Sequence, residues 1–164
     1  DMEAVQPRDL FLRTGIEVTT VGVGAKTVKS AFGLTVTANI TEDEFSPADA
    51  EAIIFPGGMP GAANLAASPA VKNAIAFALE HNRVIGAICA APGVVLANTG
   101  ALSGKNYTCF PGFEVSEGNY TAAKVERDGN LVTGNGPAAA AEFAAVVAGA
   151  ITPKAEDLIR KMYK

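Results

Sequence analysis

Val84–Gly93 reads VIGAICAAPG, which predicts a short apolar strand that ends at a cysteine and turns sharply into a helix. Small residues stand two places before and two places after Cys89. A tight strand-to-helix turn needs them, because a bulky neighbour would clash with the backbone of a nucleophile held there. Free N–H groups at a helix start favour thiolate, so the pattern predicts a reactive thiol with a lowered pKa. The alternative is a small buried hydrophobe, since free cysteines are among the most buried residues.

Strands and helices alternate on both sides of this stretch. Apolar and alternating runs predict strands at 16–23, within 28–37, at 51–55, 84–88 and 107–110, and a hairpin of 123–127 with 130–133. Helical periodicity and capping signals predict helices at 2–13, after Ser68-Pro69, after Cys89, after Gly136-Pro137 and after Pro153. This alternation predicts an α/β sandwich with a mostly parallel sheet and helices on both faces.

Composition limits the possible partners. The 164 residues suit one domain, 1–164, with 49% hydrophobic residues, 18% charged residues and a net charge of -4. Because no basic cluster is present, neither nucleic acid nor an anionic membrane is expected as a partner. No apolar run reaches the length of a membrane span. One histidine and two distant cysteines predict no metal site and no cofactor, and the unpaired thiols indicate a reducing, cytoplasmic location.

A glycine-rich loop, PGGMPG at 56–61, follows the predicted strand 51–55. It does not fit a dinucleotide-binding loop, because Pro56 takes the place of the first glycine and Glu80, about where an acid should end a second strand, ends a helix instead. An oxyanion hole suits it better. Loops that follow parallel strands meet at one sheet edge, so the N–H groups of Gly58 and Ala90 could both bind an oxygen on a carbon attached to Cys89.

The site also needs a group that moves protons. His81 is the only histidine, and it falls at the polar end of a predicted helix, so a cysteine–histidine pair is poorly supported. A carboxyl group is the remaining choice. In an apolar pocket beside a thiolate, a carboxyl has a raised pKa and can hold a proton.

These motifs together resemble the ThiJ/PfpI superfamily, in its Parkinsonism-associated deglycase branch. The resemblance covers Met2 to about Ala150. It is strongest at IFPGG (54–58), AANL (62–65), AICAAP (87–92) and Gly136-Pro137 before a helix, with MEAV (2–5), Pro7, Asp9 and Gly15-Ile16 matching the first helix of the family.

The resemblance implies a flavodoxin-like fold and a specific site. Cys89 would be the nucleophile and the peroxide-sensitive thiol, and Glu3 would hydrogen-bond its sulfur, shuttle protons and stabilise a sulfinate. Gly58 and Ala90 would be the oxyanion amides. A homodimer with the site near the interface is also implied. Some members carry a histidine where this chain has Phe110, and the protease-like branch has one where this chain has Ala90, so peptidase activity is disfavoured.

The first strand of the family has no counterpart here. Members of the family begin with a central strand just before the glutamate, whereas this sequence starts at Asp1. A sheet without its middle strand would leave buried backbone groups unpaired. We therefore expect about ten to fifteen further residues upstream, the length of one strand and its loop.

Two functions from different classes fit these residues. The first is a glutathione-independent enzyme that converts methylglyoxal or glyoxal to a 2-hydroxy acid, or repairs early glycation adducts on proteins. The alternative is a non-catalytic sensor of oxidative stress or redox-regulated chaperone, in which Cys89 is oxidised to a sulfinate held by Glu3. An amidotransferase or peptidase would need a basic partner. Cys109 is expected to be a buried strand residue, with a peripheral redox thiol as the alternative.

Overall fold

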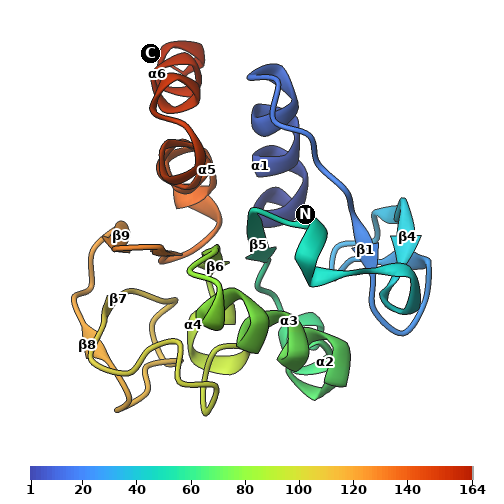
Figure 1. Ribbon diagram of the computed structural model, residues 1–164, viewed down its shortest axis with the longest axis horizontal. Coiled ribbons are helices and arrows are strands. Elements are labelled where there is room, and N and C mark those ends of the chain that lie inside the picture. The colour runs from blue at the N-terminus through green and yellow to red at the C-terminus, as the bar shows by residue number, and fades with distance from the viewer. Residues whose placement is uncertain (164) are drawn as a thin grey trace.

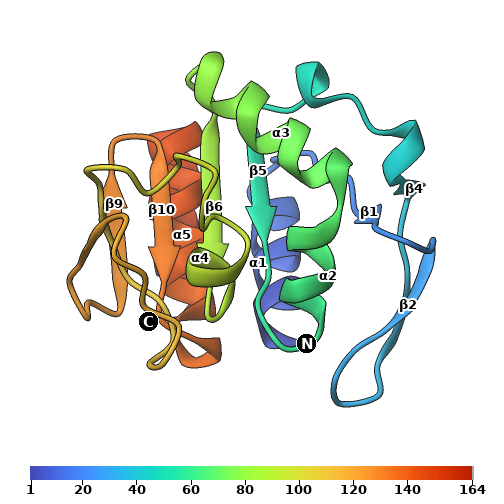
Figure 2. The ribbon, with the colours of Figure 1, turned by 90° about the horizontal axis from the view of Figure 1, so that it is seen from below.

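The computed structural model describes residues 1–163 as an α/β sandwich around a four-stranded sheet of order β5-β6-β10-β9 (Figures 1 and 2). Strands β5 (Ala52–Phe55), β6 (Val84–Ile88) and β10 (Leu131–Gly134) run parallel, and β9 (Val125–Asp128) is antiparallel to β10. The predicted architecture, a mostly parallel sheet with an antiparallel hairpin, is confirmed.

The register brings three chain segments to one edge of the sheet. Phe55 pairs with Ala87 at the end of β5, and Gly134 pairs with Ile88 at the end of β10. Because these strands are parallel, the residues that follow each of them emerge together. The glycine loop after β5 and Cys89 after β6 therefore meet, as the alternation of strands and helices predicts.

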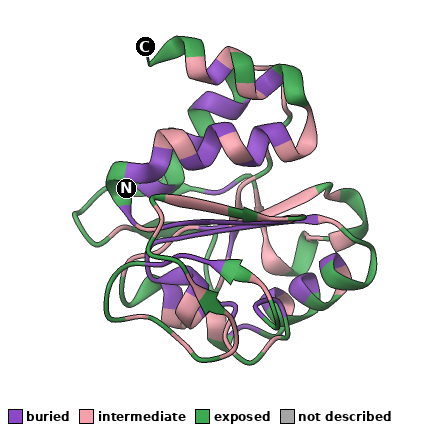
Figure 3. Cartoon of the chain, turned by 90° about the vertical axis from the view of Figure 1, so that its left-hand side faces the viewer, coloured by how far each residue is buried: buried purple, intermediate pink, exposed green. Residues whose placement is uncertain are grey.

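Helices cover both faces of the sheet (Figures 1 and 3). One face carries α1 (Met2–Arg13), α5 (Ala140–Ile151) and α6 (Pro153–Met162). The other carries α2 (Gly61–Ala67), α3 (Pro69–Glu80) and the short α4 (Ala91–Val94). The 3-10 turns η1 (Glu42–Glu44), η2 (Pro47–Asp49) and η3 (Pro137–Ala139) complete the helical segments. Within residues 1–163, no helix has the length and apolar character of a membrane span.

Helix α1 carries Glu3 in its first turn. Its end is fixed by a Schellman motif, in which the N–H groups of Gly15 and Ile16 donate to the carbonyls of Leu12 and Phe11. Gly15 has a φ of 81°, a left-handed conformation that glycine adopts without strain. Helix α1 packs against α5, and its first turn lies beside the loop after β5, because the N–H of Gly57 donates to Glu3 at 2.9 Å.

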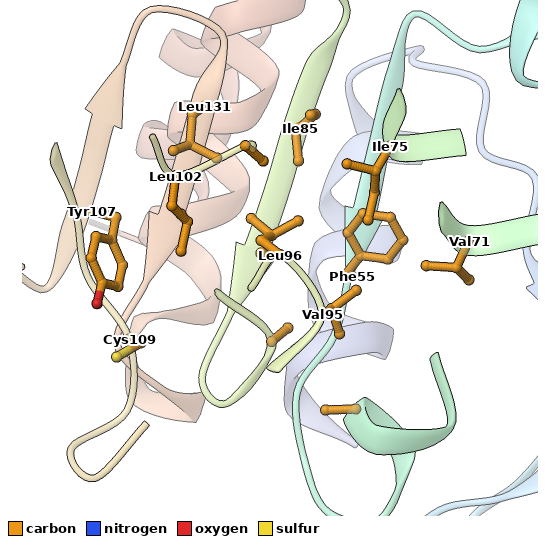
Figure 4. Packing of buried hydrophobic residues seen from close by; sticks show 14 of the residues in the cluster. Phe55, Val71, Ile75, Ile85, Val95, Leu96, Leu102, Tyr107, Cys109 and Leu131 are labelled. Carbon is orange, nitrogen blue, oxygen red and sulfur yellow. The ribbon is translucent and has the colours of Figure 1, made fainter. Parts of the chain in front are cut away.

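Two apolar clusters, one on each side of the sheet, form the core. The cluster under α2–α4 is drawn in Figure 4 and includes Phe55, Ile75, Ile85 and Leu96. The cluster on the α1 side contains Leu10, Phe11, Ile88, Cys89, Val132, Phe143, Val147 and Ile159. Strand β6 contributes to both clusters and is buried at every position, which explains its uninterrupted apolar sequence.

The strand expected at 16–23 forms only over β1 (Val21–Gly22), which pairs with β4 (Ile40–Thr41). In the described part of the chain neither strand joins the main sheet, so residues 16–20 have no strand to pair with. The two strand pieces expected within 28–37 form as the exposed β2 (Thr27–Lys29) and β3 (Thr35–Thr37), and the structure pairs them as an antiparallel hairpin.

The strand expected at 107–110 is also shorter than predicted. β7 (Asn106–Tyr107) pairs with β8 (Asn119–Tyr120) and ends before Thr108. The Thr108 N–H instead donates to Oγ1 of Thr133, a side chain of β10, at 2.9 Å. This contact draws the segment that follows β7 toward the sheet edge, beside Cys89.

Candidate active site

Cys89 stands immediately after β6 in a left-handed backbone conformation, with a φ of 64°. This conformation is strained for a residue with a side chain and persists only where the surroundings hold it. Two hydrogen bonds of 2.8 Å do so: the Cys89 N–H donates to the carbonyl of Gly134, and the Phe110 N–H donates to the carbonyl of Cys89. The neighbouring segments therefore fix the turn that presents the thiol.

Gly57 permits the closest approach to Cys89. A Cβ at position 57 would lie 2.6 Å from the Cβ of Cys89 and 2.9 Å from the N of Ala90. Only glycine leaves room for the loop after β5 to touch the turn. This contact brings the N–H of Gly58 to the sulfur of Cys89, which also accepts a hydrogen bond from the N–H of Ala90.

Glu3 completes the site from the first turn of α1. It is the one charged residue among the buried residues of 1–163, with 9% of its surface exposed. Its Oε2 accepts a hydrogen bond of 2.9 Å from the N–H of Gly57. The carboxyl group also hydrogen-bonds the Cys89 thiol. The buried charge therefore has two partners, which is what keeps a charge tolerable in an apolar setting.

The expected low pKa of Cys89 is wrong. Burial, followed by the charge and hydrogen bond of Glu3, raises the pKa of the thiol to about 11. The N–H groups of Ala90 and Gly58 act in the opposite direction and do not compensate. Helix α4, whose start was expected to favour thiolate, has only four residues. The resting thiol is therefore protonated at neutral pH.

The structure brings together Cys89, Glu3, Gly58 and Ala90, and it leaves His81 outside. His81 ends α3, where its ring stacks on Phe77 with centroids 3.8 Å apart. His81 precedes β6 and Cys89 follows this strand. A five-residue strand spans about 17 Å, so the two residues lie at opposite ends of it.

Cys109 is fully buried, as expected, although it lies beyond the end of β7. Burial raises the pKa of its thiol to about 11, and the charge of Glu114 adds to the effect.

Three residues of the site were missed in the sequence. Gly57 was assigned only to a loop, and Phe110 only to the place where some family members carry a histidine; the hydrogen bonds that join Gly134 and Phe110 to Cys89 were not predicted. The glycine pair at 57–58 carries a signal for Gly57, because close backbone approach is a standard reason for glycine beside a strand end. Nothing local predicts the other two, since their contacts depend on sheet register.

Two cavities lie away from Cys89. A cavity of about 480 Å³ is lined by Ala66, Lys72, Val94 and Asn98 among others, and one of about 220 Å³ is lined by His81, Arg83 and Asn130 among others. Neither is lined by Cys89, which has 9% of its surface exposed. Within residues 1–163, no three His, Cys, Asp or Glu side chains are placed to hold a metal ion together.

Comparisons with known proteins show what the chain is similar to. The model of the DJ-1/PfpI family matches residues 1–150. The Parkinson disease protein 7 homolog of Danio rerio is 34% identical over 154 residues, 90% of this chain and 81% of that protein. A glutathione-independent glyoxalase of Caenorhabditis elegans, DJR-1.2, is 29% identical over 148 residues, 88% of this chain and 78% of that protein. The crystal structure of a DJ-1 superfamily protein from Salmonella typhimurium matches with a TM-score of 0.90 at 31% identity, over 99% of this chain and 91% of that one.

Proposed function

This chain belongs to the DJ-1/PfpI family, and from that premise we propose that it converts methylglyoxal and glyoxal to 2-hydroxy acids without glutathione or another cofactor. One observation carries the proposal: a buried thiol shares a hydrogen bond with a buried carboxyl group while two backbone N–H groups point at the same sulfur. The glyoxalase named among the relatives supports the reaction type. Repair of early glycation adducts on proteins would use the same chemistry.

The first step joins the thiol to the aldehyde. The aldehyde oxygen binds at the N–H groups of Gly58 and Ala90, which stabilise the negative charge that develops on it. Because the pKa of Cys89 is raised to about 11, little free thiolate is present at neutral pH. The sulfur therefore attacks as its proton passes to the Glu3 carboxylate, and the product is a hemithioacetal.

The second step moves hydrogen between the two carbons. Glu3 first gives its proton to the oxygen of the hemithioacetal, and its carboxylate then takes the proton from the former aldehyde carbon. The result is an enediolate with its negative charge on the former ketone oxygen. Glu3 returns the proton to the neighbouring carbon, and the hydroxyl proton of the hemithioacetal passes to the former ketone oxygen, which leaves a thioester on Cys89. Water hydrolyses the thioester, which releases the 2-hydroxy acid and restores the thiol. In the net reaction, one dicarbonyl and one water give one 2-hydroxy acid.

The unpaired thiols lead us to propose a cytoplasmic location, and the family resemblance leads us to propose a homodimer. Helix α1 offers an apolar outer surface for it, because Met2, Val5 and Leu12 are 53%, 46% and 43% exposed. Light scattering on the purified protein would give twice the mass of the chain if the proposal is right, and the mass of one chain if it is wrong.

The test is lactate release from methylglyoxal in the absence of glutathione. Three proteins are compared after circular dichroism has shown that each is folded: the unaltered chain, Cys89→Ala, and Cys109→Ala as the control that removes the other thiol. We expect lactate from the unaltered chain and from Cys109→Ala, and none above background from Cys89→Ala.

Absence of lactate from the folded, unaltered chain would refute the enzyme. The alternative, a sensor of oxidative stress, is then tested with hydrogen peroxide. A stoichiometric sulfinate on the Cys89 peptide, without turnover of any dicarbonyl, would support it, since Glu3 and two N–H groups surround the sulfur.

A further inference from the structure

A large apolar side chain stays exposed beside Cys89. Phe110 has 43% of its surface exposed, although its backbone N–H donates to the carbonyl of Cys89 at 2.8 Å. A phenylalanine on an ordinary surface has no such tie to a buried site residue. The backbone of Phe110 therefore adjoins Cys89 while its ring stays exposed.

The backbone of Phe110 is held rigidly. Its carbonyl accepts a hydrogen bond of 3.1 Å from the N–H of Phe113, which closes a turn with Pro111 and Gly112 at its centre, and Gly112 has a φ of 94°. The turn is pressed against α4, because a Cβ at Gly93 would lie 1.7 Å from the carbonyl oxygen of Phe113. Phe110 is thus fixed relative to Cys89 before a ligand arrives.

The ring rests on a residue without a side chain. A Cβ at Gly136 would lie 3.2 Å from Cδ2 of Phe110, so the ring packs against the backbone of the loop after β10 and leaves its remaining surface open. Met59, which follows Gly58 in the chain, is 48% exposed. Two segments that build the site therefore carry exposed apolar side chains.

We propose that Phe110 determines the specificity of this site and favours 2-oxoaldehydes with an alkyl or aryl substituent over glyoxal. The inference rests on the proposed function. When the aldehyde carbon lies at Sγ of Cys89, a substituent on the neighbouring carbon covers the exposed ring. Each buried methylene is worth about a fourfold gain in binding. A phenyl substituent gains about tenfold or more by the same reasoning.

The experiment measures kcat/KM for phenylglyoxal, methylglyoxal and glyoxal. Phe110→Ala should lower the ratio of phenylglyoxal to glyoxal about tenfold, since the apolar partner of the substituent is gone. Phe110→Leu, which keeps an apolar side chain, should fall between the two. The matched control is Phe32→Ala, because Phe32 is 90% exposed on the β2–β3 hairpin, outside the site. An unchanged or increased ratio in Phe110→Ala would overturn the inference.

A second measurement does not depend on turnover. The rates at which N-phenylmaleimide and N-methylmaleimide alkylate Cys89 are followed by the mass of the Cys89 peptide in the same variants. The preference for the phenyl reagent should fall in Phe110→Ala and stay unchanged in Phe32→Ala. If the unaltered chain makes no 2-hydroxy acid but shows this dependence, the proposed enzyme fails and apolar recognition by Phe110 stands. If it makes 2-hydroxy acids and neither ratio depends on Phe110, the inference alone fails.

Discussion

Replacing Glu3 by glutamine should make Cys89 react faster with alkylating reagents and should abolish the conversion of dicarbonyls. Glutamine keeps an oxygen that can accept the hydrogen bond from the N–H of Gly57, now 2.9 Å long, and it removes the negative charge beside the sulfur. We expect the thiol to react faster with an alkylating reagent, because its pKa falls. We expect the conversion of dicarbonyls to be lost, because no carboxylate remains to accept the proton.

The size of the first effect follows from the pKa. Burial is the largest cause of the raised value of about 11, and the charge and hydrogen bond of Glu3 come next. Removing a like charge at contact distance lowers the pKa of a thiol by about one unit. This gives about ten times more thiolate at pH 8, while the lower pKa makes that thiolate about three times less nucleophilic. The net gain in rate is about threefold.

Iodoacetamide labelling of the Cys89 peptide at pH 8, followed by mass spectrometry, measures the first effect, and lactate release measures the second. Asp9→Asn is the control, because Asp9 lies on the same helix, pairs with Arg13 at 2.7 Å and is exposed. It should change neither property. Slower labelling in Glu3→Gln would show that the carboxylate does not hold the pKa of the thiol up, and retained lactate release would show that Glu3 does not move the proton.

Two further predictions concern stability. Gly57→Ala should lower the free energy of unfolding by about 1–3 kcal/mol and slow the labelling of Cys89, because the added Cβ would lie 2.6 Å from the Cβ of Cys89. Urea denaturation measures the loss of stability. An unchanged midpoint would contradict the close contact. The protein should also lose stability as the pH rises from about 9 toward about 11, since the thiols of Cys89 and Cys109 keep their protons in the folded state up to about 11 but lose them near 9 when unfolded. Urea midpoints at pH 8 and pH 10.5 measure this loss, which should be smaller when both cysteines are replaced by alanine.

The local signals in the sequence were sufficient for much of the fold. The helix predicted at 2–13 has those bounds, and the hairpin predicted for 123–127 with 130–133 forms from β9 and β10. The run at 84–88 forms a strand that is buried at every position. Each of these depends on neighbours within a few residues, so the pattern alone carries the information. The strands expected at 16–23 and 107–110 were overestimated, because strand length depends on a partner strand and not on local propensity.

The position of Cys89 follows from the sequence, whereas the pKa of its thiol depends on the tertiary structure. The sequence by itself placed Cys89 at a tight turn after a buried strand and predicted that the Gly57-Gly58 loop would meet it, because parallel strands end at a common edge. From the residues alone nothing joined Glu3 to Cys89; a family resemblance suggested the pair, and the packing of α1 brings it about. The pKa of the thiol was decided only by the tertiary structure. Burial and a carboxylate distant in sequence outweigh the local N–H groups, so the sign of the shift is opposite to the one that the helix start predicts.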